Sequence, residues 1–261
     1  MKRILLAGIS LCTVLFIIYY TTIAYYYYAP PKHKTPYQIR KTDNDTIRIA
    51  YIGDSWAYMH QQQEQCLIPQ ITEEQVQSPT RVYSYGLSGK TSKEIYEALF
   101  TDNRLRKLML EQGAEYCFIS VGINDVNKKM STQYYQKSMD GIIGFLLSNN
   151  IHPIILEIPD FDVYKAYRGL QTNRKILRKL SMIINDVPMD CKQIFRDALD
   201  TLVKENGYQH KVSIIRYKTW NNDYSNDQNR LYLRDGVHLN NYGYSVLDSV
   251  IARVILTNIK K

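Results

Sequence analysis

The chain has 261 residues and a formal net charge of +8, with 45% hydrophobic and 22% charged residues. This is the composition of an ordinary globular protein, so it excludes disorder as the default state of the chain. The length fits one domain with an appendage better than two full domains. A core of roughly 200 residues needs neither disulfides nor a metal to hold it together.

The first 28 residues differ from the rest. Lys2 and Arg3 precede an uncharged, mostly apolar run, residues 4–24, and about 20 apolar residues are enough to span a bilayer as a helix. Basic residues in front of such a run favour a cytoplasmic N-terminus. We expect residues 1–28 to be an uncleaved signal-anchor, which would make the chain a single-pass protein of the cell membrane with the remainder outside the cytoplasm.

Other interpretations of this segment stay open or are disfavoured. A cleaved signal peptide would end after Ala24, because Thr22-Ile23-Ala24 loosely matches the small-x-small cleavage rule, and would leave a secreted or periplasmic domain. The apolar run exceeds the usual signal-peptide core, which favours the anchor. A lipoprotein signal ending at Cys12 is disfavoured, because Leu11 stands where a small residue is expected.

Residues 29–45 are rich in proline and predict a linker, and residues 46–261 form the expected domain. Within that domain, short apolar runs alternate with stretches of helical spacing. The runs predict strands at 46–52, 82–85, 116–121, 153–158 and 212–216. The helical stretches are 92–112, 133–147, 173–185, 190–205 and 241–258. This alternation predicts a three-layer α/β/α sandwich with a mainly parallel sheet, and a polar, loop-like stretch runs from 220 to 232.

The positive charge does not indicate a nucleic-acid partner, because no basic helix or aromatic-basic module appears. We expect a solvated surface with some attraction to anionic envelope polymers or lipids. Outside the first segment the cysteines are Cys66, Cys117 and Cys191. They are an odd number without a CxxC pair, so the sequence predicts neither a disulfide framework nor a metal site.

Ligands of open parallel sheets bind beyond the carboxyl ends of the strands, and three polar motifs follow predicted strands. Gly53-Asp54-Ser55 follows the first. A serine there starts the next helix, whose positive end favours a developing oxyanion, although a simple helix cap is the commoner explanation of such a turn. Gly86 to Gly89 follows the second strand and could point a backbone N–H into a site.

The third motif is Gly122-Ile123-Asn124-Asp125, in which the Asn124 side chain could donate to an oxyanion. The last motif is Asp235-Gly236-Val237-His238. An aspartate three residues before a histidine can orient the imidazole while the other ring nitrogen faces a serine, which is the logic of the Ser-His-Asp triad. Each motif by itself is also explained by an ordinary turn.

Together the four motifs resemble the SGNH (GDSL-type) hydrolase family over residues 46–258. The resemblance implies a flavodoxin-like fold without a cofactor or metal. It makes Ser55 the nucleophile, His238 the general base and Asp235 its orienter. It also implies an oxyanion hole formed by the backbone N–H groups of Ser55 and Gly89 and by the side chain of Asn124.

Two residues depart from the family pattern. Trp56 stands where the GDSL form has leucine, and Ser84 stands where many members carry asparagine. Neither position supplies a catalytic group, so the departures concern the subfamily. Trp56 could pack in the core or form a wall on which a sugar stacks, and core packing is favoured.

The sequence thus predicts an extracytoplasmic serine esterase that removes acetyl or other short acyl groups from a glycan. A membrane-tethered O-acyltransferase that modifies an envelope polysaccharide is the first alternative, since transfer and hydrolysis share one acyl-enzyme. A lysophospholipase or thioesterase is the next. A non-catalytic glycan-binding protein is disfavoured, because a binding module needs neither nucleophile nor base. The oligomeric state is left open.

Overall fold

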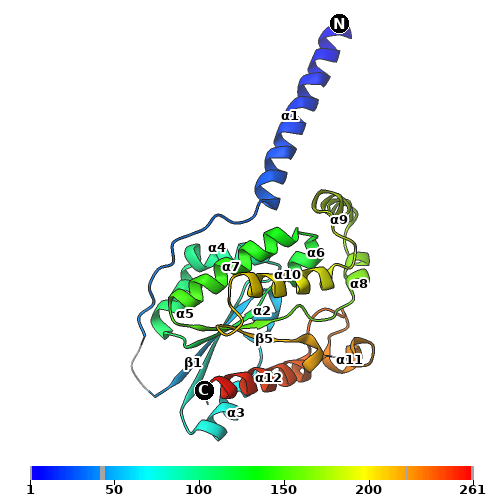
Figure 1. Ribbon diagram of the computed structural model, residues 1–261. Coiled ribbons are helices and arrows are strands. Elements are labelled where there is room, and N and C mark those ends of the chain that lie inside the picture. Colours follow the sequence, from blue (N-terminus) through cyan, green and yellow to red (C-terminus); the bar gives the residue numbers. More distant parts are fainter. Residues whose placement is uncertain (1, 42–44, 222, 260–261) are drawn as a thin grey trace. The chain divides into compact units, whose positions relative to one another are not determined.

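The structure, a computed structural model, describes residues 2–41, 45–221 and 223–259 (Figure 1). It divides into two compact units, Met1–Pro30 and Pro31–Lys261. The first unit holds helix α1 (Lys2–Tyr28). Within the described ranges, its stretch Gly8–Tyr28 is the one helix long and apolar enough to cross a membrane, with a mean hydropathy of 1.6 and no part buried.

The second unit is built on a parallel sheet of five strands in the order β2-β1-β3-β4-β5. This order is the flavodoxin-like, doubly wound one, with its switch point between β1 and β3. The predicted fold class is therefore confirmed. The strands are β1 (Ile47–Gly53), β2 (Thr80–Gly86), β3 (Tyr116–Ser120), β4 (His152–Leu156) and β5 (Ser213–Ile215).

Helices cover both faces of the sheet. Figure 1 shows α4, α5, α7 and α10 over one face, and α3 with α12 over the other. The longer helices are α3 (Leu67–Val76), α4 (Ser92–Thr101), α5 (Asn103–Gln112), α7 (Thr132–Ser148), α9 (Thr172–Asn185), α10 (Lys192–Glu205), α11 (Tyr224–Leu231) and α12 (Asn241–Ile259). Three helices have six residues each: α2 (Ser55–His60), α6 (Ile123–Lys128) and α8 (Val163–Arg168).

Two sequence predictions of local structure were wrong. The helix predicted over 92–112 is broken at Asp102, whose backbone is extended (φ −86°, ψ 113°) and whose side chain accepts from the N–H groups of Arg104 and Leu105. Asp102 thereby ends α4 and caps α5, as a short acidic side chain does well. The predicted loop at 220–232 contains α11, which Asp223 caps by accepting from the N–H of Asn226.

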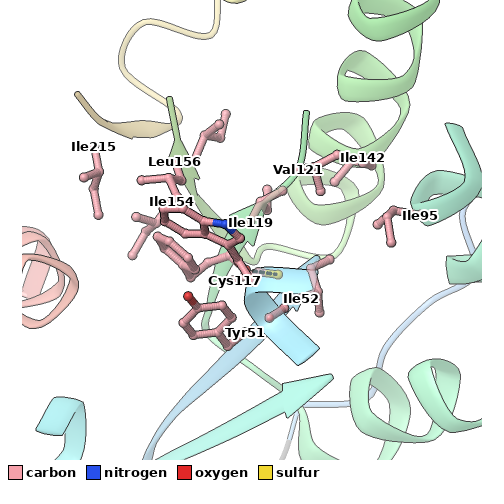
Figure 2. Packing of buried hydrophobic residues seen from close by; sticks show 14 of the residues in the cluster. Tyr51, Ile52, Ile95, Cys117, Ile119, Val121, Ile142, Ile154, Leu156 and Ile215 are labelled. Carbon is pink, nitrogen blue, oxygen red and sulfur yellow. Dashed lines mark hydrogen bonds between the residues drawn. The ribbon is translucent and has the colours of Figure 1, made fainter. Parts of the chain in front are cut away.

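The core lies on both sides of the central strands. All seven residues of β1 are buried, because helices cover it on both faces. Figure 2 shows side chains of neighbouring strands packed together, among them Tyr51 of β1, Cys117 and Ile119 of β3 and Ile154 of β4. Burying an isoleucine side chain such as that of Ile119 or Ile154 stabilises the fold by about 1.5–3 kcal/mol.

The segment predicted as a linker, 29–45, is partly fixed on the domain. The Tyr37 hydroxyl donates to the Leu99 carbonyl at 2.8 Å. The N–H of Ile39, whose side chain is buried, donates to Asn149 Oδ1 at 2.7 Å. Residues 42–44 of this segment lie outside the described ranges.

Candidate active site

The first motif sits where β1 and β3 end side by side. A Cβ atom on Gly53 would lie 2.1 Å from the carbonyl oxygen of Ser120, so no side chain fits there. The next N–H, of Asp54, donates to the same carbonyl at 3.0 Å. The Asp54 side chain accepts from the N–H of Trp56 and so caps α2. This turn places Ser55 at the first position of α2.

The side chains of Ser55, His238 and Asp235 form a hydrogen-bonded chain. His238 Nε2 lies 2.9 Å from Ser55 Oγ, and His238 Nδ1 lies 2.7 Å from Asp235 Oδ2. The other oxygen of Asp235, Oδ1, accepts from the backbone N–H groups of Val237 and His238. Burial alone would raise the pKa of Asp235, but the hydrogen bonds from His238 and Val237 hold it below its ordinary value. The carboxylate is therefore ionised and can fix the imidazole.

Three hydrogen bonds hold the loop that carries His238. The Trp56 indole N–H donates to the carbonyl of Val237 at 3.1 Å, and the Tyr224 hydroxyl donates to that of Gly236 at 2.6 Å. The N–H of Leu233 donates to the His238 carbonyl at 2.7 Å. Gly236 has a φ of 72°, which suits glycine. These contacts fix the position of the loop, which suits the role expected for His238 from the sequence.

The residues expected to form the oxyanion hole lie on two neighbouring turns. Asn124 is on the first turn of α6, and its Nδ2 lies 3.4 Å from Asp54 Oδ2, a long hydrogen bond. Gly89 has a φ of 74° on the turn after β2, with open space where a Cβ would be. That turn is joined to the first motif, since the N–H of Leu87 donates to the Gly53 carbonyl at 2.9 Å.

Two buried carboxyl groups lie beneath the site. Burial raises the pKa of Asp54 to about 7, and the charge of Asp125 adds to the rise while the N–H of Trp56 opposes it. Burial also raises the pKa of Asp125 to about 7, against the hydrogen bonds from Ser92. Burial therefore favours the protonated form of both carboxyls.

Asp125 belongs to the third motif, but its role could not be read from the sequence. In the structure its two oxygens accept from Ser92, one from the backbone N–H at 2.8 Å and one from the hydroxyl at 2.5 Å. Ser92 is the first residue of α4 and closes the turn that holds Gly89. Asp125 therefore ties the turn after β3, which carries Asn124, to the turn after β2, which carries Gly89.

Aromatic residues near the site pack inward. Trp56 is fully buried, so it forms no wall for a sugar, and core packing is confirmed. Its ring meets Trp220 edge to face at 6.0 Å and Tyr232 at 6.3 Å. These two residues are also buried, and the Tyr232 hydroxyl donates to the carbonyl of Asp160.

A second Ser, His and Asp group lies in the core. His60 Nδ1 is 2.8 Å from Ser84 Oγ, and Nε2 is 2.9 Å from Asp248 Oδ1. Among the described residues, His60, Asp248 and Cys66 are also the one His/Cys/acid group close enough to hold a metal, with ligand atoms within 4.8 Å. The N–H of Leu67 occupies the remaining oxygen of Asp248. Protein groups thus satisfy both ring nitrogens and both carboxylate oxygens, so we assign this buried network to the packing of α2 and α12.

Similarity to known proteins is found at the level of structure. No family model and no curated protein matches the chain. Among solved structures, the chain is similar to a GDSL-like lipase from Bacteroides thetaiotaomicron, at 15% identity and a TM-score of 0.52, over 81% of this chain and 88% of that one.

Two esterases give similar values. The psychrotrophic esterase EstA from Pseudoalteromonas sp., in a structure inhibited by monoethylphosphonate, has 15% identity and a TM-score of 0.55, over 84% of this chain and 100% of that one. The acetyl xylan esterase AlAXEase has 16% identity and a TM-score of 0.54, over 80% and 100%. At such identities the likeness shows a common fold.

Proposed function

We propose, from the premise that the chain has the fold of the SGNH (GDSL-type) hydrolases, that it is a serine esterase in which Ser55 is the nucleophile. One observation carries the proposal: His238 Nε2 lies 2.9 Å from Ser55 Oγ while Nδ1 lies 2.7 Å from an ionised Asp235. These are the contacts that a nucleophile, its general base and the orienter of that base require.

The geometry supports a two-step reaction. With a proton on Nδ1, His238 donates to Asp235 and accepts from the Ser55 hydroxyl. Ser55 Oγ attacks the ester carbonyl carbon as its proton passes to Nε2, and negative charge develops on the carbonyl oxygen. The imidazolium then returns that proton to the leaving alcohol, which leaves Ser55 acylated. Water attacks the acyl carbon as it gives a proton to the same imidazole. The bond to Ser55 Oγ then breaks, the imidazolium returns the proton to that oxygen, and the acid is released.

The negative charge that develops on the carbonyl oxygen needs hydrogen-bond donors that point at that oxygen. The backbone N–H groups of Ser55 and Gly89 and the amide of Asn124 are the proposed donors. Removing one such donor typically lowers the rate by about 10²–10³-fold. The link from Asp125 to Ser92 would keep two of the three in register before substrate binds.

For the substrate we propose a glycan that carries acetyl or other short acyl esters, outside the cytoplasm. The support is the apolar helix α1, which suits a membrane anchor or a signal sequence, and a neighbour in fold that is an acetyl xylan esterase. An anchor also favours a second candidate, transfer of the acyl group to an envelope polysaccharide. In that reaction a sugar hydroxyl takes the place of water.

Hydrolysis of p-nitrophenyl acetate by the full chain tests the proposal. Ser55→Ala should abolish it, whereas Ser84→Ala, which removes the serine hydroxyl bound to His60, should leave it within a few-fold of the unmodified chain. Equal activity of the Ser55→Ala variant would refute the nucleophile. Acetylated glycan supplied with and without an acceptor sugar then separates the two candidates, because only a transferase acylates the sugar.

A further inference from the structure

Helix α9 turns its apolar side chains away from the protein. Ile176, Leu177, Ile183 and Ile184 are 55%, 45%, 78% and 50% exposed, whereas Ser181 is buried. With the half-buried Leu180 these residues have the spacing of one helical stripe, and surface helices normally pack such a stripe on the core. The outer stripe of α9 is defined here as residues 176, 177, 180, 183 and 184.

The chain around this outer stripe is strongly basic. Residues 163–185 contain no acidic residue and six basic ones, namely Lys165, Arg168, Arg174, Lys175, Arg178 and Lys179. By helical spacing Arg174 and Lys179 flank the stripe on its two sides, and both are exposed. An amphipathic helix with this composition suits the headgroup region of an anionic lipid layer. A second copy of the chain would instead bring six like charges against these, which disfavours self-association through this face.

Helix α8, which precedes α9 in the chain, is joined to the rim of the candidate active site. Asp162, which caps α8, donates its N–H to the Tyr224 hydroxyl at 3.1 Å and to the Gly236 carbonyl at 3.3 Å. Gly236 lies between Asp235 and His238. At the C-terminal end of α9, the amide of Asn185 donates to the carbonyl of Lys129 at 2.6 Å. Figure 1 shows α8 and α9 outside the layer formed by α7 and α10.

We propose that α9 lies in the surface of an anionic lipid layer, with its outer stripe between the headgroups and the acyl chains and the flanking Arg174 and Lys179 against lipid phosphates. The proposal rests on the membrane tether of the proposed function, because α1 would keep the domain at the lipid. It adds that the site approaches its substrate from the membrane side, where a lipid-carried acyl donor or acceptor could reach it.

Tryptophan fluorescence in vesicles tests this contact on the full chain. Ile183→Trp puts a reporter on the outer stripe, and Tyr242→Trp puts one on an exposed position of α12. The native Trp56 and Trp220 are buried and give a constant background. In phosphatidylcholine vesicles with a quarter phosphatidylglycerol, lipids brominated on the upper acyl chain should quench the stripe reporter at least twofold more than the α12 reporter. Without the anionic lipid, the difference should fall by more than half.

Each other outcome contradicts a defined part of the account. Equal quenching at both positions overturns the contact of α9, and quenching that ignores phosphatidylglycerol overturns the anionic partner. If neither brominated lipid nor iodide quenches the stripe reporter and the chain cross-links as a dimer, the outer stripe packs against a second copy of the chain, and the lipid contact is wrong. If the chain does not float with vesicles, both the proposed membrane anchor and this inference are wrong. If it floats and hydrolyses p-nitrophenyl acetate but the stripe reporter stays unquenched, only this inference fails. Ile176→Trp repeats the test should the first variant misfold.

Discussion

At the scale of single residues, the site divides into groups that would take part in the chemistry and groups that hold them. Ser55, His238 and Asp235 touch one another directly. The Asn124 side chain lies outside this chain of hydrogen bonds. Its one described hydrogen bond, to Asp54, is long and leaves the amide able to turn toward an oxyanion. Its contribution should therefore appear mainly in the transition state.

Asn124→Ala should lower kcat by about 10²-fold and change KM little, since the lost donor acts on the charge that develops during reaction. Steady-state hydrolysis of p-nitrophenyl acetate measures both constants. Asn127→Ala, on the same short helix, is the control and should stay close to the unmodified chain. A raised KM with an unchanged kcat would instead make Asn124 a substrate-binding residue.

Asp54 gives a prediction about stability. Its pKa of about 7 exceeds the ordinary value of 3.8, so between these values the folded chain holds a proton that the unfolded chain has lost. The contribution of Asp54 to the free energy of unfolding therefore falls as pH rises from 4 to 7, by up to about 1.4 kcal/mol per pH unit. Asp54→Asn should remove this loss, and its stability relative to the unmodified chain should rise over that range. Urea denaturation at pH 4, 5.5 and 7 measures the free energy of unfolding of both chains. The exposed Asp197→Asn is the control. A difference between Asp54→Asn and the unmodified chain that stays constant with pH would contradict the burial argument.

At the scale of elements, each proposed catalytic group depends on a loop that another element holds in place. The loop of His238 is fixed by the indole of Trp56 in α2 and by Tyr224 in α11. The turn of Gly89 is fixed by Asp125 in α6. These supports come from elements far apart in the chain, so damage to them should change catalysis without touching a catalytic group.

Trp56→Phe tests one of these supports. It leaves the Val237 carbonyl without its donor and should lower kcat several-fold while KM changes little, because the imidazole is no longer held at one distance from Ser55. Stability should fall by about 1–3 kcal/mol. Trp220→Phe is a matched control, because within the described structure its indole nitrogen is buried without a partner. Equal losses of kcat in both variants would show that ring volume matters, and not the hydrogen bond.

The sequence predicted the elements whose signal is local. All five strands were found. The buried ones are short apolar runs, and β2 is a short run of alternating residues that ends at a glycine. The break at Asp102 was missed because apolar spacing continues on both sides of it. The links from Asp125 to Ser92 and from His60 to Asp248 could not be predicted, since 33 and 188 positions separate the partners. Only the assembled sheet and its helices bring them together.

At the scale of the whole molecule, two compact units carry different tasks in the proposed function. The second unit holds the candidate site at the carboxyl edge of its sheet, where doubly wound folds bind ligands. The first unit is a helix with no buried residue in its apolar stretch, which is long and apolar enough for a membrane anchor or a signal sequence. Whether this helix is retained or cleaved decides whether the domain stays at the membrane.

We predict that α1 is retained in the mature protein, because the run from residue 4 to 24 is long enough to span the hydrocarbon layer of about 30 Å as a helix. N-terminal sequencing of protein from the producing cell checks this, together with its distribution between membrane and soluble fractions. Recovery of soluble chains that begin at Tyr25 would show cleavage after Ala24. That result would remove the tether and leave the esterase proposal intact.

The central claim is that Ser55 is a nucleophile activated by His238 and Asp235, and covalent labelling addresses it most directly. A fluorophosphonate reacts with an activated serine hydroxyl and leaves a stable adduct, which mass spectrometry of peptides places on one residue. We predict a single adduct on Ser55, lost in Ser55→Ala, slowed at least 10²-fold in His238→Ala and retained in Ser84→Ala. An adduct on any other residue, or labelling of Ser55 at an unchanged rate without the imidazole, would contradict the account.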